Sequence, residues 1–207
     1  MSSLREPTLK PVPLAQLRPT QITIGFREVE ERRKRWRARK RGNQRAFFAT
    51  HMIPVVLGPK GRHYVIDHHH LARALMDEGV TDVFVTLIAR LERLTEKVFW
   101  TVLDNRGWMH PFDAKGRRRD YGDIPHSILD LADDPFRSLA GALRRVGGYS
   151  KETAPFSEFL WADFLRRRLK RQLVKHEFDA ALRKALALAK SRDADYLPGW
   201  CGVTDDG

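Results

Sequence analysis

The chain has 207 residues and a formal net charge of +12 at pH 7, with 42% hydrophobic and 31% charged residues. These are globular values that exclude a disordered tail, and the length allows one domain or one domain with a sizeable extension. The basic excess favours an anionic partner such as nucleic acid, a nucleotide or acidic lipid headgroups, although solubility alone would also explain it.

Cysteine usage and hydropathy set further bounds. Cys201 is the only cysteine, which excludes an intramolecular disulfide and a cysteine-based zinc site. The first residues contain no apolar stretch long enough for a signal peptide. No window approaches the roughly 20 apolar residues that a membrane span needs. We therefore expect a cytoplasmic protein with no membrane partner.

The N-terminal half predicts short strands that alternate with helices. Residues 8–24 hold three prolines among apolar residues, a density that suits an edge strand and its turns. Gly25 permits a break before a helix that begins near Arg27 or Glu28. Residues 54–57 and 63–66 predict a hairpin around a turn at 58–61, and residues 82–88 predict another strand.

A strand that runs almost directly into a helix is the central feature of this half. Asp67 follows the strand at 63–66 and has the residue type of a helix N-cap. Leu71, Ala74 and Leu75 then recur at helical spacing, and Gly79 is a fitting stop. One carboxylate and three imidazoles therefore lie at a helix N-terminus, where free N–H groups and the helix dipole favour an anion such as phosphate.

Helical signals dominate the rest of the chain. Thr95 is the expected cap of one helix, whose inward residues would be Val98, Phe99, Val102 and Leu103. Asp134 with Pro135 predicts the start of another helix, with an apolar stripe at Phe136, Leu139, Ala140, Leu143 and Val146. A longer helix or helix pair spans residues 155–189, with an inward side that contains Phe156, Phe159, Leu160, Trp161 and Phe164. The predicted organisation is an α+β domain at 1–110 and a helical extension at 111–207 that packs on it.

Two clusters of basic residues are candidates for nucleic-acid contacts. Nine basic residues lie between Arg32 and Arg45, with Trp36 among them. A helix through these residues would be either a solvated connector, whose arginines pair with Glu28, Glu30 and Glu31, or a surface that contacts phosphate groups. The second cluster lies in a turn-rich loop after residue 109. The predicted nucleic-acid-binding residues are Arg32, Arg33, Arg35, Arg39, Lys40, Arg117, Arg118 and Arg119.

The segment Asp-His-His-His-Leu-Ala-Arg-Ala-Leu at 67–75 resembles the Asp-Gly-His-His-Arg box of the ParB/sulfiredoxin superfamily, especially its branch of ParB-like nucleases. The resemblance extends to residues 14–20, 25–29, 134–140 and 155–165. It implies an α+β, ParB/sulfiredoxin-like fold with a small mixed sheet, helices around it and a helical C-terminal half. It also implies that the box binds phosphate at a helix N-terminus.

This chain departs from the box at two positions. His68 stands at the place of the glycine, and Leu71 at the place of the arginine that contacts phosphate in nucleotide-using relatives. The second change removes a bidentate donor that lysine or histidine does not reproduce. The predicted phosphate-binding residues are therefore His68, His69, His70 and Arg73, although Arg73 lies two positions beyond Leu71.

The resemblance leaves three functions open. A phosphodiester-cleaving nuclease is the leading hypothesis, with Asp67, His69 and His70 as catalytic residues and Asp67 as a candidate ligand of Mg²⁺ or another divalent cation. Consecutive helical residues point about 100° apart, so the three histidines cannot all bind one ion. A module that binds nucleic acid or nucleotide without turnover is the non-enzymatic alternative.

The enzymatic alternative is a free-serine-type kinase that uses ATP or ADP. Glu28 matches the place of the catalytic glutamate of such relatives, where it would act as general base on a substrate hydroxyl. A simpler interpretation is that Glu28 stabilises the first turn of its helix through the dipole. Sulfiredoxin chemistry is disfavoured because the box has no cysteine. A chromosome-partitioning ParB is disfavoured because its Gly-Glu-Arg-Arg box is missing.

Overall fold

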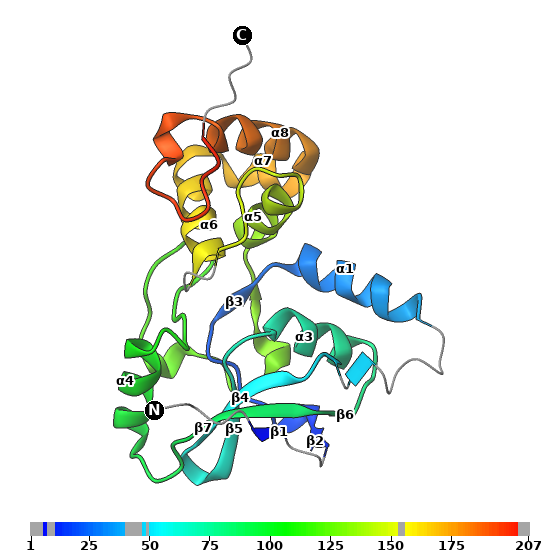
Figure 1. Ribbon diagram of the computed structural model, residues 1–207, viewed down its shortest axis with the longest axis vertical. Coiled ribbons are helices and arrows are strands. Elements are labelled where there is room, and N and C mark those ends of the chain that lie inside the picture. The colour runs from blue at the N-terminus through cyan, green and yellow to red at the C-terminus, as the bar shows by residue number, and fades with distance from the viewer. Residues whose placement is uncertain (1–5, 8–10, 40–46, 49, 153–155, 203–207) are drawn as a thin grey trace. The chain divides into compact units, whose positions relative to one another are not determined.

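The computed structural model describes residues 6–7, 11–39, 47–48, 50–152 and 156–202. They form two compact units, whose elements are shown in Figure 1. Unit 1 comprises residues 1–24, 28–113 and 117–132, and unit 2 comprises residues 25–27, 114–116 and 133–207. Each unit has a hydrophobic core of its own.

A mixed four-stranded sheet with the order β1-β7-β4-β5 is the framework of unit 1. β4 (Ile53–Gly58) pairs antiparallel with β5 (Arg62–Val65) and parallel with β7 (Val85–Arg90), and β7 pairs antiparallel with β1 (Glu6–Pro7). Val55 and Val56 of β4 are both fully buried but belong to different hydrophobic clusters. Apolar groups therefore cover both faces of this central strand.

Two helices of unit 1 pack on the two faces of this sheet. α3 (His69–Asp77) contributes Leu71 and Leu75 to the cluster of Val55, and α4 (Glu96–Asn105) contributes Phe99 and Leu103 to the cluster of Val56. α1 (Phe26–Arg37) also belongs to unit 1 from Glu28 onward. Two short strand pairs are also present: β2 (Val12–Pro13) with β6 (Asp82–Val83), and β3 (Thr23–Ile24) with β8 (Ala132–Asp133), whose second residue belongs to unit 2.

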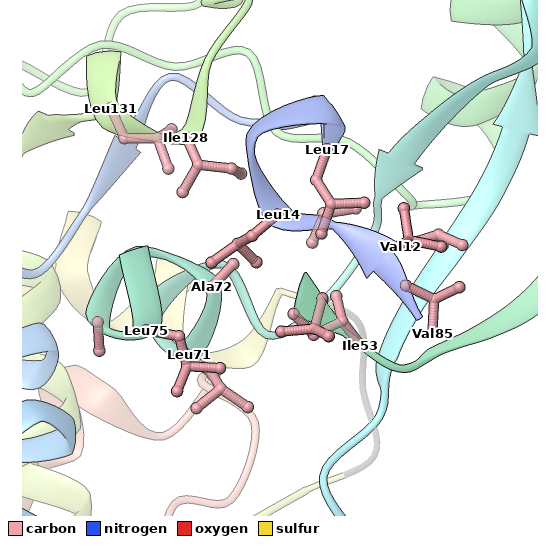
Figure 2. Packing of buried hydrophobic residues seen from close by; sticks show 14 of the residues in the cluster. Val12, Leu14, Leu17, Ile53, Leu71, Ala72, Leu75, Val85, Ile128 and Leu131 are labelled. Carbon is pink, nitrogen blue, oxygen red and sulfur yellow. The ribbon is translucent and has the colours of Figure 1, made fainter. Parts of the chain in front are cut away.

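The N-terminal segment and α3 share one core. Leu14 and Leu17 are buried together with Leu71, Ala72 and Leu75 of the helix. Figure 2 shows Leu14 directed toward Ala72, with Ile128 and Leu131 nearby. Leu14 begins the 3-10 helix at 14–16, whose C-cap is Leu17, and Ile128 begins the 3-10 helix at 128–130, whose C-cap is Leu131. The body of α3 is thus anchored by segments distant in the chain, which fixes the position of its N-terminus.

Unit 2 is a helical bundle. Its helices are α5 (Pro135–Arg145), α6 (Ser157–Arg168), α7 (Arg171–His176) and α8 (Phe178–Ala189). Phe136, Trp161 and Phe164 are at most 2% exposed and occupy its core. The ring of Trp161 stacks on that of Tyr149 at a centroid distance of 4.4 Å. These aromatic side chains are therefore packing residues.

Asp134 holds the start of α5, as the sequence predicts. One carboxylate oxygen accepts a hydrogen bond from the N–H of Phe136 at 3.1 Å, and the other accepts from the guanidinium of Arg166. Burial raises the pKa of Asp134, although the charges of Arg166 and Arg137 act in the opposite direction. The carboxylate therefore serves as both helix cap and ion-pair partner.

The predicted α+β fold is confirmed, with a small mixed sheet, flanking helices and a mainly helical C-terminal half. Three residues predicted to face inward do not: Val98 is 46%, Leu160 45% and Val146 50% exposed. Val98 lies near the start of α4 and Val146 is the C-cap of α5. Helical spacing identifies the apolar face of a helix but not how far the neighbouring core covers it.

One strand boundary and one helix cap also differ from the sequence-based prediction. The strand expected at residues 82–88 is divided into β6 and β7, which belong to different sheets. Thr95 is the N-cap of α4, but its side chain makes no capping hydrogen bond. The expected helix start at Pro155 lies outside the described residues. No helix in the described part of the chain is long and apolar enough to cross a membrane.

Candidate functional site at the β5–α3 junction

The junction between β5 and α3 begins with Asp67, which is not the N-cap that the sequence predicts. The N-cap is His68, and helix α3 starts one residue later at His69. One oxygen of the Asp67 carboxylate accepts a hydrogen bond from the backbone N–H of His68 at 2.6 Å. The side chain of Asp67 is 77% exposed. Its carboxylate is thus held next to the helix N-terminus while it stays open to solvent.

His68 adopts an unusual backbone conformation at this N-terminus. Its φ of 65° and ψ of 24° lie in the left-handed region, which glycine tolerates and other residues rarely adopt. The box that this segment resembles has glycine at this position, whereas this chain places an imidazole in the left-handed conformation. The side chain of His68 makes no capping hydrogen bond to the first turn of α3.

His69 faces the protein interior. It is 5% exposed, and its Nε2 accepts a hydrogen bond from the backbone N–H of Thr20 at 3.1 Å. The hydroxyl of Thr20 donates to the carbonyl of Val65 at 2.7 Å. Thr20 thereby connects the end of β5 with the first turn of α3. This geometry gives His69 a positioning role in the junction.

His70 and Arg73 occupy different surroundings on the same helix. His70 is half-buried in the first turn of α3. Arg73 donates from Nε to Asp77 and from one terminal nitrogen to the carbonyl of Leu129, both at 2.9 Å. These contacts direct the guanidinium of Arg73 toward the C-terminal part of α3 and the segment around Leu129. Among the predicted phosphate ligands, His68 lies next to Asp67, with its Nε2 4.0 Å from a carboxylate oxygen, and His70 is the half-buried imidazole in the first turn of α3.

Glu28 and Leu71 are buried. Glu28 is 8% exposed in the first turn of α1, where its charge complements the helix dipole. Leu71 is 4% exposed and belongs to the core that joins α3 to the sheet. The position of the box arginine is therefore filled by a core residue in this chain. A guanidinium in the same direction would have to replace an apolar contact.

The basic residues of α1 divide into two groups. Arg33 and Arg37 bind the carboxylate of Glu78 at 2.7 and 2.6 Å and also pair with Glu30. These contacts, the hydrogen bond from Arg37 first, lower the pKa of Glu78 to about 2. Arg32, Arg35 and Arg39 make no ion pair with any described residue and line a pocket instead. Lys40 lies outside the described residues.

The second basic cluster is largely engaged in local contacts. Arg118 pairs with the carboxylate of Asp104, which also accepts from the hydroxyl of Tyr121. Arg119 pairs with Asp123 at 3.3 Å, and the backbone N–H of Arg117 donates to Asp113 at 3.0 Å. All three side chains are exposed. Their predicted contact with nucleic acid stays a prediction.

The role of Asp67 as a metal ligand stays a prediction. The described residues contain no group of three or more His, Cys, Asp or Glu that could hold a metal ion. One exposed carboxylate is nevertheless compatible with Mg²⁺. This ion keeps several waters and is commonly held by one or two carboxylates together with the phosphate groups of a substrate. Any such ion at Asp67 would complete its coordination with water and with the phosphate of a substrate.

Comparison with known proteins defines the class of this chain. Residues 10–167 match the family described as "Putative ParB-like nuclease". The chain therefore belongs to this family of ParB-like proteins. Among proteins with curated descriptions, none matches the chain.

Solved structures provide two further comparisons. The chain is similar to protein Atu1540 from Agrobacterium tumefaciens, with 56% identity and a TM-score of 0.90, over 96% of this chain and 98% of that one. It is also matched to C-terminally truncated chromosome-partitioning protein ParB from Caulobacter crescentus, complexed with CTP-gamma-S, with 14% identity and a TM-score of 0.31 over 89% and 93% of the two chains. At that TM-score, nothing about this chain follows from the second match.

Proposed function

We propose that this ParB-like protein binds a phosphate-bearing ligand, a nucleic acid or a nucleotide, at the N-terminus of α3. The observation that carries the proposal is a helix start without a side-chain cap, beside the half-buried His70. The first-turn N–H groups of a helix and its dipole attract an anion. The net charge of +12 attracts the same ligands over a longer range.

Phosphodiester hydrolysis is the reaction that we propose for this site. His70 would donate a hydrogen bond to a phosphate oxygen, and the first turn of α3 would orient that group. The exposed carboxylate of Asp67 would hold a divalent cation or orient the attacking water. A bound Mg²⁺ would supply stabilisation of negative charge on the phosphate. His69 would act indirectly, because its Nε2 is occupied by Thr20.

Glu28 supports a second candidate, the phosphorylation of a small hydroxyl compound by ATP or ADP. Glu28 is 8% exposed in the first turn of α1, at the place where the kinase-type relatives that the sequence resembles have their catalytic glutamate. In a kinase it would accept the proton of the substrate hydroxyl. Such an activity requires Glu28, whereas hydrolysis at the α3 N-terminus does not.

Binding and turnover assays on the same variants test the proposal. The ligands are single-stranded DNA, RNA, duplex DNA, ATP and ADP, each with Mg²⁺, with Mn²⁺ and with a chelator. His70→Ala should weaken binding of the active ligand, and Asp67→Asn should lower cleavage in the presence of metal. The matched controls are His126→Ala and Asp82→Asn, which alter exposed residues of the same unit.

Three outcomes are informative. Cleavage that is lost in Asp67→Asn but retained in Glu28→Gln supports the nuclease. Nucleotide consumption that needs a hydroxyl compound and fails in Glu28→Gln supports the kinase. Binding that falls with salt, yields no product and is the same in His70→Ala as in His126→Ala contradicts a site at the α3 N-terminus and leaves a basic surface only.

A further inference from the structure

A pocket in unit 1 lies between α1 and α3. Figure 1 shows α1 running beside α3, and side chains from both helices line one hollow of about 70 Å³. Leu71, Ala74 and Leu75 of α3 form its apolar side. Trp36, Phe47 and His51 supply aromatic rings, and the remaining lining residues are Arg32, Arg35 and Arg39. We call this feature the α1–α3 pocket.

The three arginines make this pocket strongly cationic. Arg32 and Arg35 lie three positions apart on one side of α1, and Arg39 follows the end of the helix and lines the same pocket. Arg33 and Arg37 lie on the other side, where Glu78 and Glu30 neutralise them. Within the described residues, no carboxylate forms an ion pair with Arg32, Arg35 or Arg39. Like charges three and four positions apart repel each other, so an anion in the pocket would relieve this repulsion.

The aromatic residues of the pocket are all in contact with Phe47. The ring of His51 stacks on that of Phe47 at 4.2 Å, with 17° between the planes. The guanidinium of Arg39 lies 4.3 Å from the centre of the same ring. Trp36 meets Phe47 edge-on at 5.4 Å. Phe47 is 7% exposed and hence covered, whereas Trp36 and His51 are partly exposed and present their rings to the pocket.

We infer that the α1–α3 pocket binds a nucleoside phosphate, either as a free nucleotide or as the end of a single strand. Guanidinium groups bind phosphate oxygens in a bidentate manner. The faces of Trp36 and Arg39 suit a flat heterocycle, since bases stack on aromatic rings and on guanidinium planes. Inorganic phosphate would leave the side formed by Leu71, Ala74 and Leu75 unused. The inference uses residues other than Asp67 and His70, so it goes beyond the proposed function and does not depend on it.

Calorimetric titration of the full chain tests whether the nucleoside and the phosphate are both recognised. The probes are AMP, adenosine, ribose 5-phosphate, inorganic phosphate and a short oligo-dA strand with a 5′-phosphate. AMP should bind at least about tenfold more tightly than adenosine or ribose 5-phosphate, since each of these lacks one of the recognised groups. A higher affinity for the strand identifies its 5′ end as the preferred source, and a higher affinity for AMP identifies the free nucleotide.

Two double variants that remove the same charge distinguish binding in the pocket from attraction by the net positive charge of the protein. Arg35→Gln with Arg39→Gln removes two pocket donors, whereas Arg33→Gln with Arg37→Gln removes the same charge from the side paired with Glu78. The first pair of substitutions should weaken AMP binding at least about tenfold, because hydrogen bonds between charged groups are stronger than those between neutral groups. The second pair should weaken it much less. Trp36→Phe should remove the ligand-dependent change in tryptophan fluorescence. Thermal unfolding of every variant establishes that it is folded.

Several results would overturn the inference. One is equal weakening by the two arginine pairs, which would indicate attraction by net charge alone. Another is binding of ribose 5-phosphate or adenosine as tightly as AMP. A third is AMP affinity that depends on His70 and not on Arg35 and Arg39, a result that would leave the α3 N-terminus as the site. Conversely, loss of AMP binding in the Arg35 and Arg39 variant with no effect of His70→Ala supports the pocket and contradicts the α3 site.

Discussion

The Nε2 atom of His69 lies 3.1 Å from the backbone nitrogen of Thr20, a residue 49 positions earlier in the chain. Both residues are buried, and the Thr20 hydroxyl also contacts the carbonyl of Val65. A histidine within a predicted catalytic box is therefore used to join the N-terminal segment to the helix that carries the box. The other residues of the junction depend on this anchor for their positions.

We expect His69→Ala to destabilise the protein by about 1–3 kcal/mol, because the buried N–H of Thr20 would lose its acceptor. Denaturant unfolding of the variant measures this cost. The control His126→Ala changes an exposed histidine of the same unit and should stay within about 0.5 kcal/mol of the parent. A His69→Ala variant as stable as its control would show that the Thr20 contact does not hold the junction.

His68→Gly should have the opposite effect. His68 has a φ of 65°, a conformation that costs a non-glycine residue about 1–2 kcal/mol. Glycine removes this cost but adds entropy to the unfolded chain, so we expect a net gain of about 1 kcal/mol in the free energy of unfolding. His68→Ala keeps the Cβ atom and should show no such gain. Equal stability of the two variants would contradict backbone strain at this position.

Local patterns predicted much of this structure. Spacing and residue type predict the hairpin around 58–61, the helix after Asp67 and the cap at Asp134, and all three are present. They are features of neighbouring residues, which the sequence displays directly. The boundary expected between residues 110 and 111 stays a prediction; the chain clusters into two units, and unit 2 contains residues 25–27 and 114–116 as well as 133–207.

Contacts between distant residues were the part that could not be predicted. No local pattern indicates that His69 meets Thr20, or that Glu78 selects Arg33 and Arg37 from a run of similar arginines. The same limit applies to Leu71, whose apolar nature was evident but whose part in a pocket was not. A signal did exist for that pocket: Arg32, Arg35 and Arg39 recur on one helical face, and Trp36 lies among them.

In unit 2, Asp134→Ala should be among the more damaging single substitutions. It removes the cap of α5 and leaves Arg166, whose side chain is 15% exposed, without one of its two carboxylate partners. We expect a loss of about 2–4 kcal/mol. Asp134→Asn retains a good capping residue and should lose clearly less. Asp195→Ala, an exposed aspartate of the same unit, is the control. Equal losses in the alanine and asparagine variants would show that the cap contributes little.

The ion pairs of Glu78 should make stability depend on pH in the acidic range. Hydrogen bonds from Arg37 and then Arg33 lower the pKa of Glu78 to about 2 in the folded chain, from an ordinary value of 4.5. The folded state therefore binds this proton less readily than the unfolded state. The stabilisation is fully present above the unfolded pKa and is lost progressively as pH falls from about 4.5 toward 2.

Glu78→Gln should remove that part of the pH dependence. Thermal unfolding of parent and variant between pH 2 and 7 is the measurement, and the two melting temperatures should differ most near neutral pH and converge in acid. High salt should reduce the difference, because these side chains are partly exposed and their charges are screened. A melting temperature difference that stays constant from pH 7 to pH 2 would mean that Glu78 contributes through packing, and that its charge is not what holds Arg33 and Arg37.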